Sequence, residues 1–279
     1  MAMTYLELKQ NVSRRLQDSG IESFNAESQW LIAEYSGLKP LELTLSGNSN
    51  VPGDVLEKIT SAVNRRCGHE PLQYIIGKAY FREIVLKVNQ SVLIPRPETE
   101  LLVNWVLKET PGNGSLLELG TGSGAIALSC ASERPDLHIT AADISAEALE
   151  VAKENAKRLD LKLDFVQSDL YQALPSGAVY DMIAANLPYV RFDEINLLAS
   201  EVKDFEPHLA LFAEQDGLEI IFRAARGLSE HLKPGGKAIF ELAPPQAPVL
   251  KTFLEELGFR SEIKLDHTQR ERFVTAGMI

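Results

Sequence analysis

Cysteine is scarce in this chain: Cys67 and Cys130 are the only two among 279 residues, and they lie far apart in the sequence. A disulfide framework or a zinc cluster needs more cysteines, so we expect a reducing compartment. The five histidines are scattered, and none has the spacing of a metal ligand. We therefore expect no metal site.

Basic residues are also few, because 28 Lys and Arg face 39 Asp and Glu, for a formal net charge of −11. Non-specific attraction of the whole chain to nucleic acid is not expected, although a local basic face remains open. No apolar run approaches the ~20 residues that span a bilayer, and the N-terminus lacks the basic-then-apolar pattern of a secretion signal. We expect no membrane association and a cytoplasmic location.

Residues 1–75 have the pattern of helices only. Thr4 and Glu7 fit a capping box at the start of the first helix, and Leu8, Val12 and Leu16 recur at four-residue spacing. We predict a small helical bundle. No group of reactive side chains stands out in it, so its expected role is to bind a partner or to cover a site.

The period changes in the next segment, which we predict to be a β-hairpin linker over residues 76–95. Residues 74–76, 79–81 and 84–88 have the pattern of short strands, separated by Gly77 and by the polar pair Arg82 and Glu83. Pro95 and Pro97 then stiffen the chain on either side of Arg96.

Strands and helices alternate through the last region, residues 96–279. We predict strands at 115–119, 138–142, 163–167, 179–185, 237–242, 262–265 and 272–276, and helices at 125–132, 145–159, 217–232 and 249–257. Such alternation predicts an α/β fold with a mostly parallel sheet covered on both faces. Ligands of these sheets bind beyond the carboxyl ends of the strands, so the loops after Leu119, Ala142, Gln167 and Ala185 are the ones to consider.

The first three loops suit a nucleoside-containing cofactor. A glycine-rich loop links a strand to a helix and lets the backbone approach a ligand closely; its residues are Glu118, Gly120, Thr121, Gly122, Ser123 and Gly124. Asp143, followed by Ile144, is placed to accept hydrogen bonds from ribose hydroxyls, or it caps the next helix. Asp169 can accept from an adenine amino group with Leu170 against the ring, or it is a plain turn residue. These loops fit both S-adenosylmethionine and a dinucleotide.

The fourth loop separates these two cofactors. Its residues Asn186, Leu187, Pro188 and Tyr189 resemble the Asn-Pro-Pro-Tyr signature of methyltransferases that act on planar nitrogen, and a dehydrogenase has no use for it. An amide or aromatic amino nitrogen is a poor nucleophile, because its lone pair is delocalised. Two acceptors on its N–H bonds counter this and stabilise the positive charge that builds during attack. We assign these acceptors to the Asn186 side-chain oxygen and the Leu187 carbonyl, with Pro188 stiffening the turn and Tyr189 offering a flat surface.

With these loops and several further segments, the chain resembles the HemK/PrmC-type protein-(glutamine) methyltransferases. The similar segments are residues 70–77, 92–100, 118–125, 186–189, 206–207 with 210–211, 216–218, and 234–236 leading to Glu241 and Gln246. Of these, Ile94-Pro95-Arg96-Pro97-Glu98-Thr99-Glu100 is far more specific than the glycine loop. Three departures stand out: Leu187 replaces the usual first proline, residues 243–245 replace an Ile-Gly start, and the tail 267–272 matches loosely.

The resemblance implies a class I, Rossmann-like methyltransferase fold with a mostly parallel seven-stranded sheet. It implies that a methyl group passes from S-adenosylmethionine, leaving S-adenosylhomocysteine, to the glutamine of the Gly-Gly-Gln motif in class I peptide chain release factors. The helical bundle would bind the release factor, and Arg96, Asn186, Leu187, Pro188 and Tyr189 would contact the substrate. The enzyme would act as a monomer and would need no nucleic acid.

Three other interpretations remain open. A ribosomal RNA adenine methyltransferase shares the Asn-Leu-Pro-Tyr string, but predicts a basic groove and a C-terminal helical domain. A glutamine methyltransferase of a ribosomal protein is a closer alternative. A binding module with an inactive cofactor site is opposed by the intact Gly120, Gly122, Gly124, Asp143 and Asn186.

Overall fold

The computed structural model describes residues 3–278. The chain forms two compact units, one made of Met1–Gly77 with Ser200–Phe205 and the other of Lys78–Ala199 with Glu206–Ile279. One hydrophobic core lies in the first unit and two lie in the second. Among the described residues, no helix has the length and apolar character that a membrane span requires.

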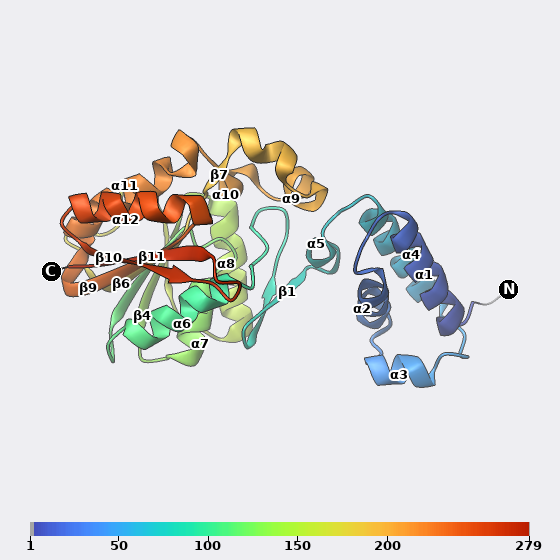
Figure 1. The fold of residues 1–279 in the computed structure, drawn as a ribbon. Coiled ribbons are helices and arrows are strands. Elements are labelled where there is room, and N and C mark those ends of the chain that lie inside the picture. Colours follow the sequence, from blue (N-terminus) through green and yellow to red (C-terminus); the bar gives the residue numbers. More distant parts are fainter. Residues whose placement is uncertain (1–2, 279) are drawn as a thin grey trace. The chain divides into compact units, whose positions relative to one another are not determined.

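The first unit is helical, as the spacing of its apolar residues predicted (Figure 1). Thr4 and Glu7 form the expected capping box: the Thr4 N–H donates to the Glu7 carboxylate over 2.8 Å, and the Glu7 N–H donates to the Thr4 hydroxyl over 3.3 Å. Leu8, Val12 and Leu16 are buried on one face of the first helix. The helices are α1 (Tyr5–Asp18), α2 (Phe24–Ser36), α3 (Pro40–Leu45), α4 (Gly53–Cys67), α5 (Leu72–Ile76) and α9 (Ser200–Phe205).

Residues 74–76, predicted as a strand, belong instead to the short helix α5. Pro71 precedes this helix, and Gly77 ends it in a left-handed conformation with φ 70°. A short apolar run has no period long enough to separate a strand from a buried helical turn. Proline before the first helical residue and glycine after the last were the signals that favoured the helix.

The second unit contains the predicted hairpin and sheet. Strands β1 (Lys78–Phe81) and β2 (Ile84–Lys87) pair antiparallel. The seven-stranded sheet has the order β10-β11-β9-β6-β3-β4-β5, and every strand except β11 runs parallel to the others. Its strands are β3 (Ser115–Leu119), β4 (His138–Asp143), β5 (Asp164–Gln167), β6 (Tyr180–Asn186), β9 (Leu232–Glu241), β10 (Arg260–Leu265) and β11 (Glu271–Gly277). The predicted mostly parallel, seven-stranded fold is confirmed.

Helices cover both faces of this sheet, as Figure 1 shows. Strand β6 shows why: Met182 and Ala184 face the core under one set of helices, whereas Ile183 and Ala185 face the other. A strand buried on both faces is continuously apolar, because alternate side chains enter different cores. The helices are α6 (Thr99–Glu109), α7 (Ala125–Glu133) and α8 (Ala146–Leu159) on one side, and α11 (Glu219–His231) and α12 (Ala247–Glu256) on the other.

Residues 190–216 were not predicted as regular structure, and they lie in short elements. Two-residue strands β7 (Val190–Arg191) and β8 (Phe212–Ala213) pair parallel. Between and after them lie α9, α10 (His208–Leu211) and the 3-10 helices η1 (Phe192–Leu197) and η2 (Gln215–Gly217). A further 3-10 helix, η3 (Pro244–Gln246), follows β9.

Candidate active site

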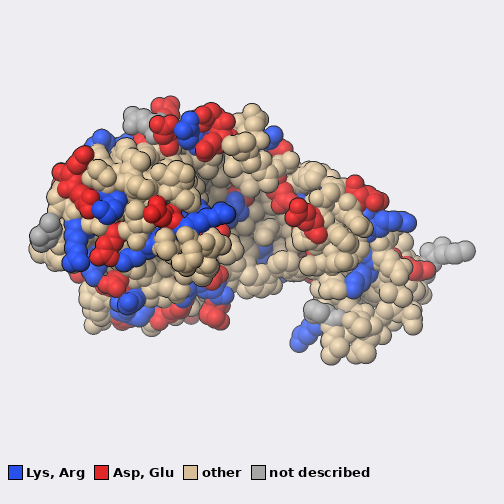
Figure 2. Space-filling model, in the orientation of Figure 1, with Lys and Arg blue, Asp and Glu red and all other residues tan. Residues whose placement is uncertain are grey.

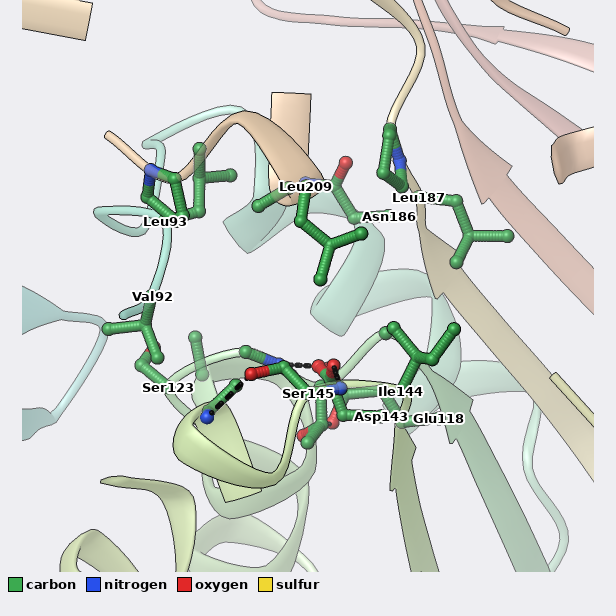
Figure 3. Close-up of a pocket in the computed structure, with 18 of the residues that line it drawn as sticks. Val92, Leu93, Glu118, Ser123, Asp143, Ile144, Ser145, Asn186, Leu187 and Leu209 are labelled. Carbon is green, nitrogen blue, oxygen red and sulfur yellow. Dashed lines mark hydrogen bonds between the residues drawn. The ribbon is translucent and has the colours of Figure 1, made fainter. Parts of the chain in front are cut away.

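The carboxyl ends of β3, β4, β5 and β6 surround a cavity of about 390 Å³ in the second unit (Figure 3). This volume lies within the usual range for small-molecule and cofactor sites. Most of the predicted site residues line it. They are Arg96, Glu118, Gly120, Thr121, Gly122, Ser123, Asp143, Ile144, Asp169, Leu170, Asn186, Leu187 and Pro188. Gly124 and Tyr189 lie outside the lining.

Two glycines of the loop after β3 have different tasks. Gly122 has φ +55°, and a Cβ atom placed there would meet no described atom within 4 Å, so the backbone is open to a ligand. Gly124, with φ +85°, precedes α7, and its Cβ would lie 2.7 Å from Leu128 Cδ1. It therefore serves the close packing of the loop on its own helix, which the prediction of a ligand contact did not foresee.

Glu118 anchors the glycine loop and the start of α7 by hydrogen bonds. One carboxylate oxygen accepts from the Thr121 hydroxyl over 2.6 Å and from the Ala127 N–H over 3.0 Å, and the residue is only 1% exposed. Burial raises the pKa of Glu118 to about 8, despite the two hydrogen bonds. The Glu118 carboxyl group thus stabilises the turn and also lines the cavity.

Asp143 joins the end of β4 to the same loop. Its Oδ2 accepts from the Gly122 N–H over 2.8 Å, and its Oδ1 accepts from the Ser145 N–H over 2.9 Å. Helix α8 is capped by Ser145, whose hydroxyl accepts from the Ala148 N–H over 3.1 Å. Asp143 is therefore not the N-cap of α8. Burial raises the pKa of Asp143.

Asp169 and Leu170 follow β5. The Arg223 guanidinium of α11 donates to the Asp169 carboxylate over 2.6 Å, and both residues line the cavity. Leu170 has a left-handed backbone with φ 52°, which is uncommon for a residue with a side chain. Its side chain lies partly buried against the core while still lining the cavity.

Asn186 ends β6 with its side chain in the cavity, across the open space from Asp143 and Ser145 (Figure 3). Its Nδ2 donates to the Thr99 hydroxyl over 3.1 Å. The two branches of an amide diverge, so the Oδ1 atom points away from Thr99 and is the acceptor that a ligand can meet. Leu187 is 5% exposed and packs into the core.

Comparison with known proteins identifies the family. A family model described as the PrmC N-terminal domain matches residues 7–77, and one described as the methyltransferase small domain matches residues 97–202. The chain is 38% identical over 256 residues to the release factor glutamine methyltransferase of Lactococcus lactis, covering 91% of this chain and 92% of that one. The corresponding protein of Deinococcus radiodurans is 33% identical over 276 residues, with 98% of each chain covered. The chain belongs to the release factor glutamine methyltransferase family.

Solved structures agree on the fold. A methyltransferase from Pyrococcus furiosus matches with a TM-score of 0.54 and 19% identity, covering 70% of this chain and 89% of that chain. A ribosomal RNA methyltransferase of T. thermophilus, solved with S-adenosylmethionine and guanosine, matches with a TM-score of 0.52 and 18% identity, covering 72% and 50%. Membership of the release factor glutamine methyltransferase family makes this chain a methyltransferase that uses S-adenosylmethionine as its methyl donor.

The cavity of this family member has the chemistry that such a cofactor needs. Ile144 is 50% exposed although it is apolar, and together with Leu170 it offers apolar surface to a flat ring. The Asp143 carboxylate uses one lone pair on each oxygen for the main chain, which leaves further acceptor capacity for hydroxyl groups. The open backbone at Gly122 completes a site that fits the group.

Tyr189 is the main difference from the predicted site of this methyltransferase. Its side chain packs against a core cluster, and its carbonyl accepts from Gln246 Nε2 over 2.8 Å. Burial, with the Glu241 charge second, raises the pKa of Tyr189 to about 12. The ring is thus partly buried against the core and lies outside the cavity lining, and its predicted contact with the substrate stays a prediction.

Several lining residues were not predicted individually. Two groups occur within segments that carried the family resemblance: Val92, Leu93, Pro95 and Thr99 before and at the start of α6, and Pro207 and Ala210 near α10. Leu209 lies between the last two and is 58% exposed. The family resemblance of these two segments was the sequence feature that could have identified these lining residues. Arg223, on α11, had no such signal.

Proposed function

We propose that this enzyme transfers a methyl group to the side-chain amide nitrogen of a glutamine in a class I peptide chain release factor. The observation that carries the proposal is the orientation of Asn186: its Nδ2 is held by Thr99, so its Oδ1 is presented to the cavity. An acceptor oxygen there suits an N–H donor on the substrate, and a glutamine amide has two such N–H groups.

The cofactor would be held by the loops after β3, β4 and β5. Asp143 would accept from ribose hydroxyls, Ile144 and Leu170 would contact the adenine, and the glycine loop around Gly122 would lie against the backbone of the ligand. Asp169 is already paired with Arg223, so its remaining lone pairs would serve the adenine amino group. When bound, S-adenosylmethionine supplies a methyl group already activated by its sulfonium centre.

Asn186 and the Leu187 carbonyl would act on the nucleophile. Each accepts from one N–H of the amide, which holds the nitrogen in place and stabilises the positive charge that develops on it. The bound cofactor would supply the methyl group to this nitrogen, and the two acceptors would keep the nitrogen aligned with it. One N–H proton then leaves to solvent, and no strong base is needed because that proton is acidic once the methyl group has arrived.

The rim of the cavity suits an uncharged side chain. Leu93, Pro188 and Leu209 are apolar, and Figure 3 shows Leu93 and Leu209 on the side of the cavity across from Asp143 and Ser145. Arg96 is a charged residue of the lining, and its guanidinium donates to the buried Glu206 carboxylate over 2.7 Å. This ion pair would hold Arg96 in place while its other N–H groups contact the substrate backbone.

The helical bundle would bind the body of the release factor. We propose a division into a release-factor-binding bundle (1–75), a hairpin linker (76–95) and a methyltransferase domain (96–279), with α9 as an addition to the bundle that the sequence did not suggest. A monomeric state and a cytoplasmic location stay predictions.

The deciding experiment offers radiolabelled S-adenosylmethionine and three separate acceptors: a class I release factor, ribosomal proteins and ribosomal RNA. We expect label in the release factor alone, and we expect N5-methylglutamine after digestion. A release factor with the Gly-Gly-Gln glutamine replaced by asparagine is the matched control, because it keeps an amide but withdraws it by one methylene. Label in ribosomal RNA or in a ribosomal protein, with none in the release factor, would reject the proposal.

A further inference from the structure

Two buried side chains, those of Thr99 and Glu241, lie next to Asn186. Asn186 and Glu241 are register partners at the carboxyl ends of the neighbouring parallel strands β6 and β9. Thr99, the first residue of α6, is adjacent to both: its hydroxyl accepts from Asn186 Nδ2 over 3.1 Å, and it lies close enough to the Glu241 carboxyl group to lower the pKa of that group by hydrogen bonding. Thr99 is 4% exposed and Glu241 is 1% exposed. Glu241 lies outside the cavity lining, whereas Thr99 is part of it.

The order of these three groups sets the direction of their hydrogen bonds. An ionised carboxylate can only accept, and a hydroxyl has a single proton to give. If Thr99 donates to Glu241, only its lone pairs remain for Asn186. The Asn186 amide must then turn its NH₂ branch to Thr99 and its oxygen to the cavity.

We infer that Thr99 and Glu241 are positioning residues that fix the Asn186 amide with its oxygen toward the acceptor nitrogen. The inference rests on the proposed function only in that the acceptor has an N–H for this oxygen to receive. Without Thr99 the amide can rotate by half a turn, and its NH₂ group would then meet the N–H of the substrate.

The burial of Glu241 supports a role beyond packing. Its Oε2 atom is buried and has no hydrogen-bond partner among the described residues. An incompletely paired buried carboxyl group costs stability, so packing alone gives no reason for it. Burial raises the pKa of Glu241 to about 7, with the Thr99 hydrogen bond and the Arg272 charge acting in the opposite direction.

The first test replaces the hydroxyl of Thr99. Thr99→Val keeps the shape but removes both hydrogen bonds, and we expect kcat to fall about tenfold or more, as for the loss of one orienting hydrogen bond. KM and the cofactor Kd should stay within about threefold. Thr99→Ser retains the hydroxyl and should restore most of kcat. Thr110→Val is the matched control, because Thr110 is equally buried at the other end of α6 and its hydroxyl bonds only to the Val106 carbonyl; it should leave kcat unchanged.

The second test replaces Glu241 by glutamine. Glu241→Gln can donate to Thr99, so the direction of the chain is no longer enforced, and kcat should fall at neutral pH. In the unsubstituted enzyme, kcat should also fall as pH drops below about 7, because protonated Glu241 can donate in the same way. The charged and titratable groups that face Glu241 are Arg272, Arg96, Glu98 and Tyr189, and all remain in the variant. Glu241→Gln should remove this acid limb from the profile.

Two results would overturn the inference: a Thr99→Val enzyme with kcat within about threefold of the parent, or a loss that Thr110→Val reproduces. If Thr99→Val does not fold, a Glu241→Gln enzyme with unchanged kcat at all pH values would overturn the inference as well. These measurements use whichever acceptor the parent enzyme methylates. Failure on the release factor alone would therefore count against the proposed substrate and leave the test of Thr99 and Glu241 intact.

Discussion

The Asp143 carboxylate accepts a hydrogen bond of 2.8 Å from the Gly122 N–H. This bond joins the end of β4 to the loop after β3. A side chain predicted to meet the cofactor also shapes the loop that meets it. Replacing Asp143 therefore removes the acceptors for ribose and loosens the backbone beside them.

The first prediction follows from this double role. Asp143→Ala should weaken S-adenosylmethionine binding by about 1–3 kcal/mol, the range for lost hydrogen bonds to a charged group. Titration calorimetry measures it. Asp181→Ala is the matched control, because Asp181 also accepts from a main-chain N–H, that of Ser115 over 2.7 Å, but at the amino-terminal ends of β6 and β3, away from the cavity. Equal cofactor affinity in the parent and the Asp143 variant would mean that this carboxylate serves the loop alone.

The second prediction concerns the acceptor clamp. Asn186→Ala should lower kcat by about 10²–10³, as removal of one preorganised hydrogen-bonding group does, whereas the cofactor Kd should change much less. Leu187→Pro keeps the main-chain carbonyl, so we expect it to retain turnover. The structure adds a cost in stability, because the Leu187 side chain is buried in the core. Steady-state kinetics and thermal unfolding separate the two effects. Loss of turnover in Leu187→Pro with full turnover in Asn186→Ala would reject the clamp.

The sheet and most of its ligand loops could be predicted because they depend on local patterns. Strand β6 is apolar from Met182 to Ala185 and ends at a polar asparagine, and the loop after β3 has glycines at close spacing. Each of these patterns can be recognised from a few consecutive residues. The parallel arrangement then brings the strand ends to one edge, whatever lies between them.

The remaining parts depend on contacts between distant residues. Thr99 and Asn186 lie 87 positions apart, and no local pattern shows that they meet. The hydrogen bond from Gln246 Nε2 to the Tyr189 carbonyl, which ties this loop to η3, joins residues 57 positions apart. Helix α9 is short and polar, and its place in the first unit is set by contacts that no periodicity records.

A third prediction uses the raised pKa of Glu118. Its ordinary value is 4.5 and its value in the folded protein is about 8, so the folded state binds more protons than the unfolded state between these values. The stability that this group contributes is therefore lost as pH rises through that window. Glu118→Gln has no such titration. Without cofactor, the melting temperature of the variant relative to the parent should increase from acidic to alkaline pH. A constant difference across the window would contradict the shift.

The fourth prediction concerns Arg66, which is 2% exposed in the first unit. Its guanidinium donates to Glu27 over 2.5 Å and to Glu201 of α9 over 2.6 Å. Arg66→Met should destabilise the first unit by about 3–5 kcal/mol, because it leaves the buried Glu27 carboxylate without its cationic partner. Glu201→Gln should cost much less, since that side chain is 38% exposed.

Arg65 provides the matched control for this effect. It is the neighbouring residue on α4 and pairs with Glu70, but its side chain is 44% exposed, so Arg65→Met should cost about 1 kcal/mol or less. The chain has two tryptophans, and a Trp105→Phe background leaves Trp30 of α2 as the reporter of the first unit. Denaturant unfolding followed by its fluorescence then measures this unit by itself. If Arg66→Met and Arg65→Met cost the same, the buried ion pair contributes no more than a surface one, and α9 must be held to the bundle by its other contacts.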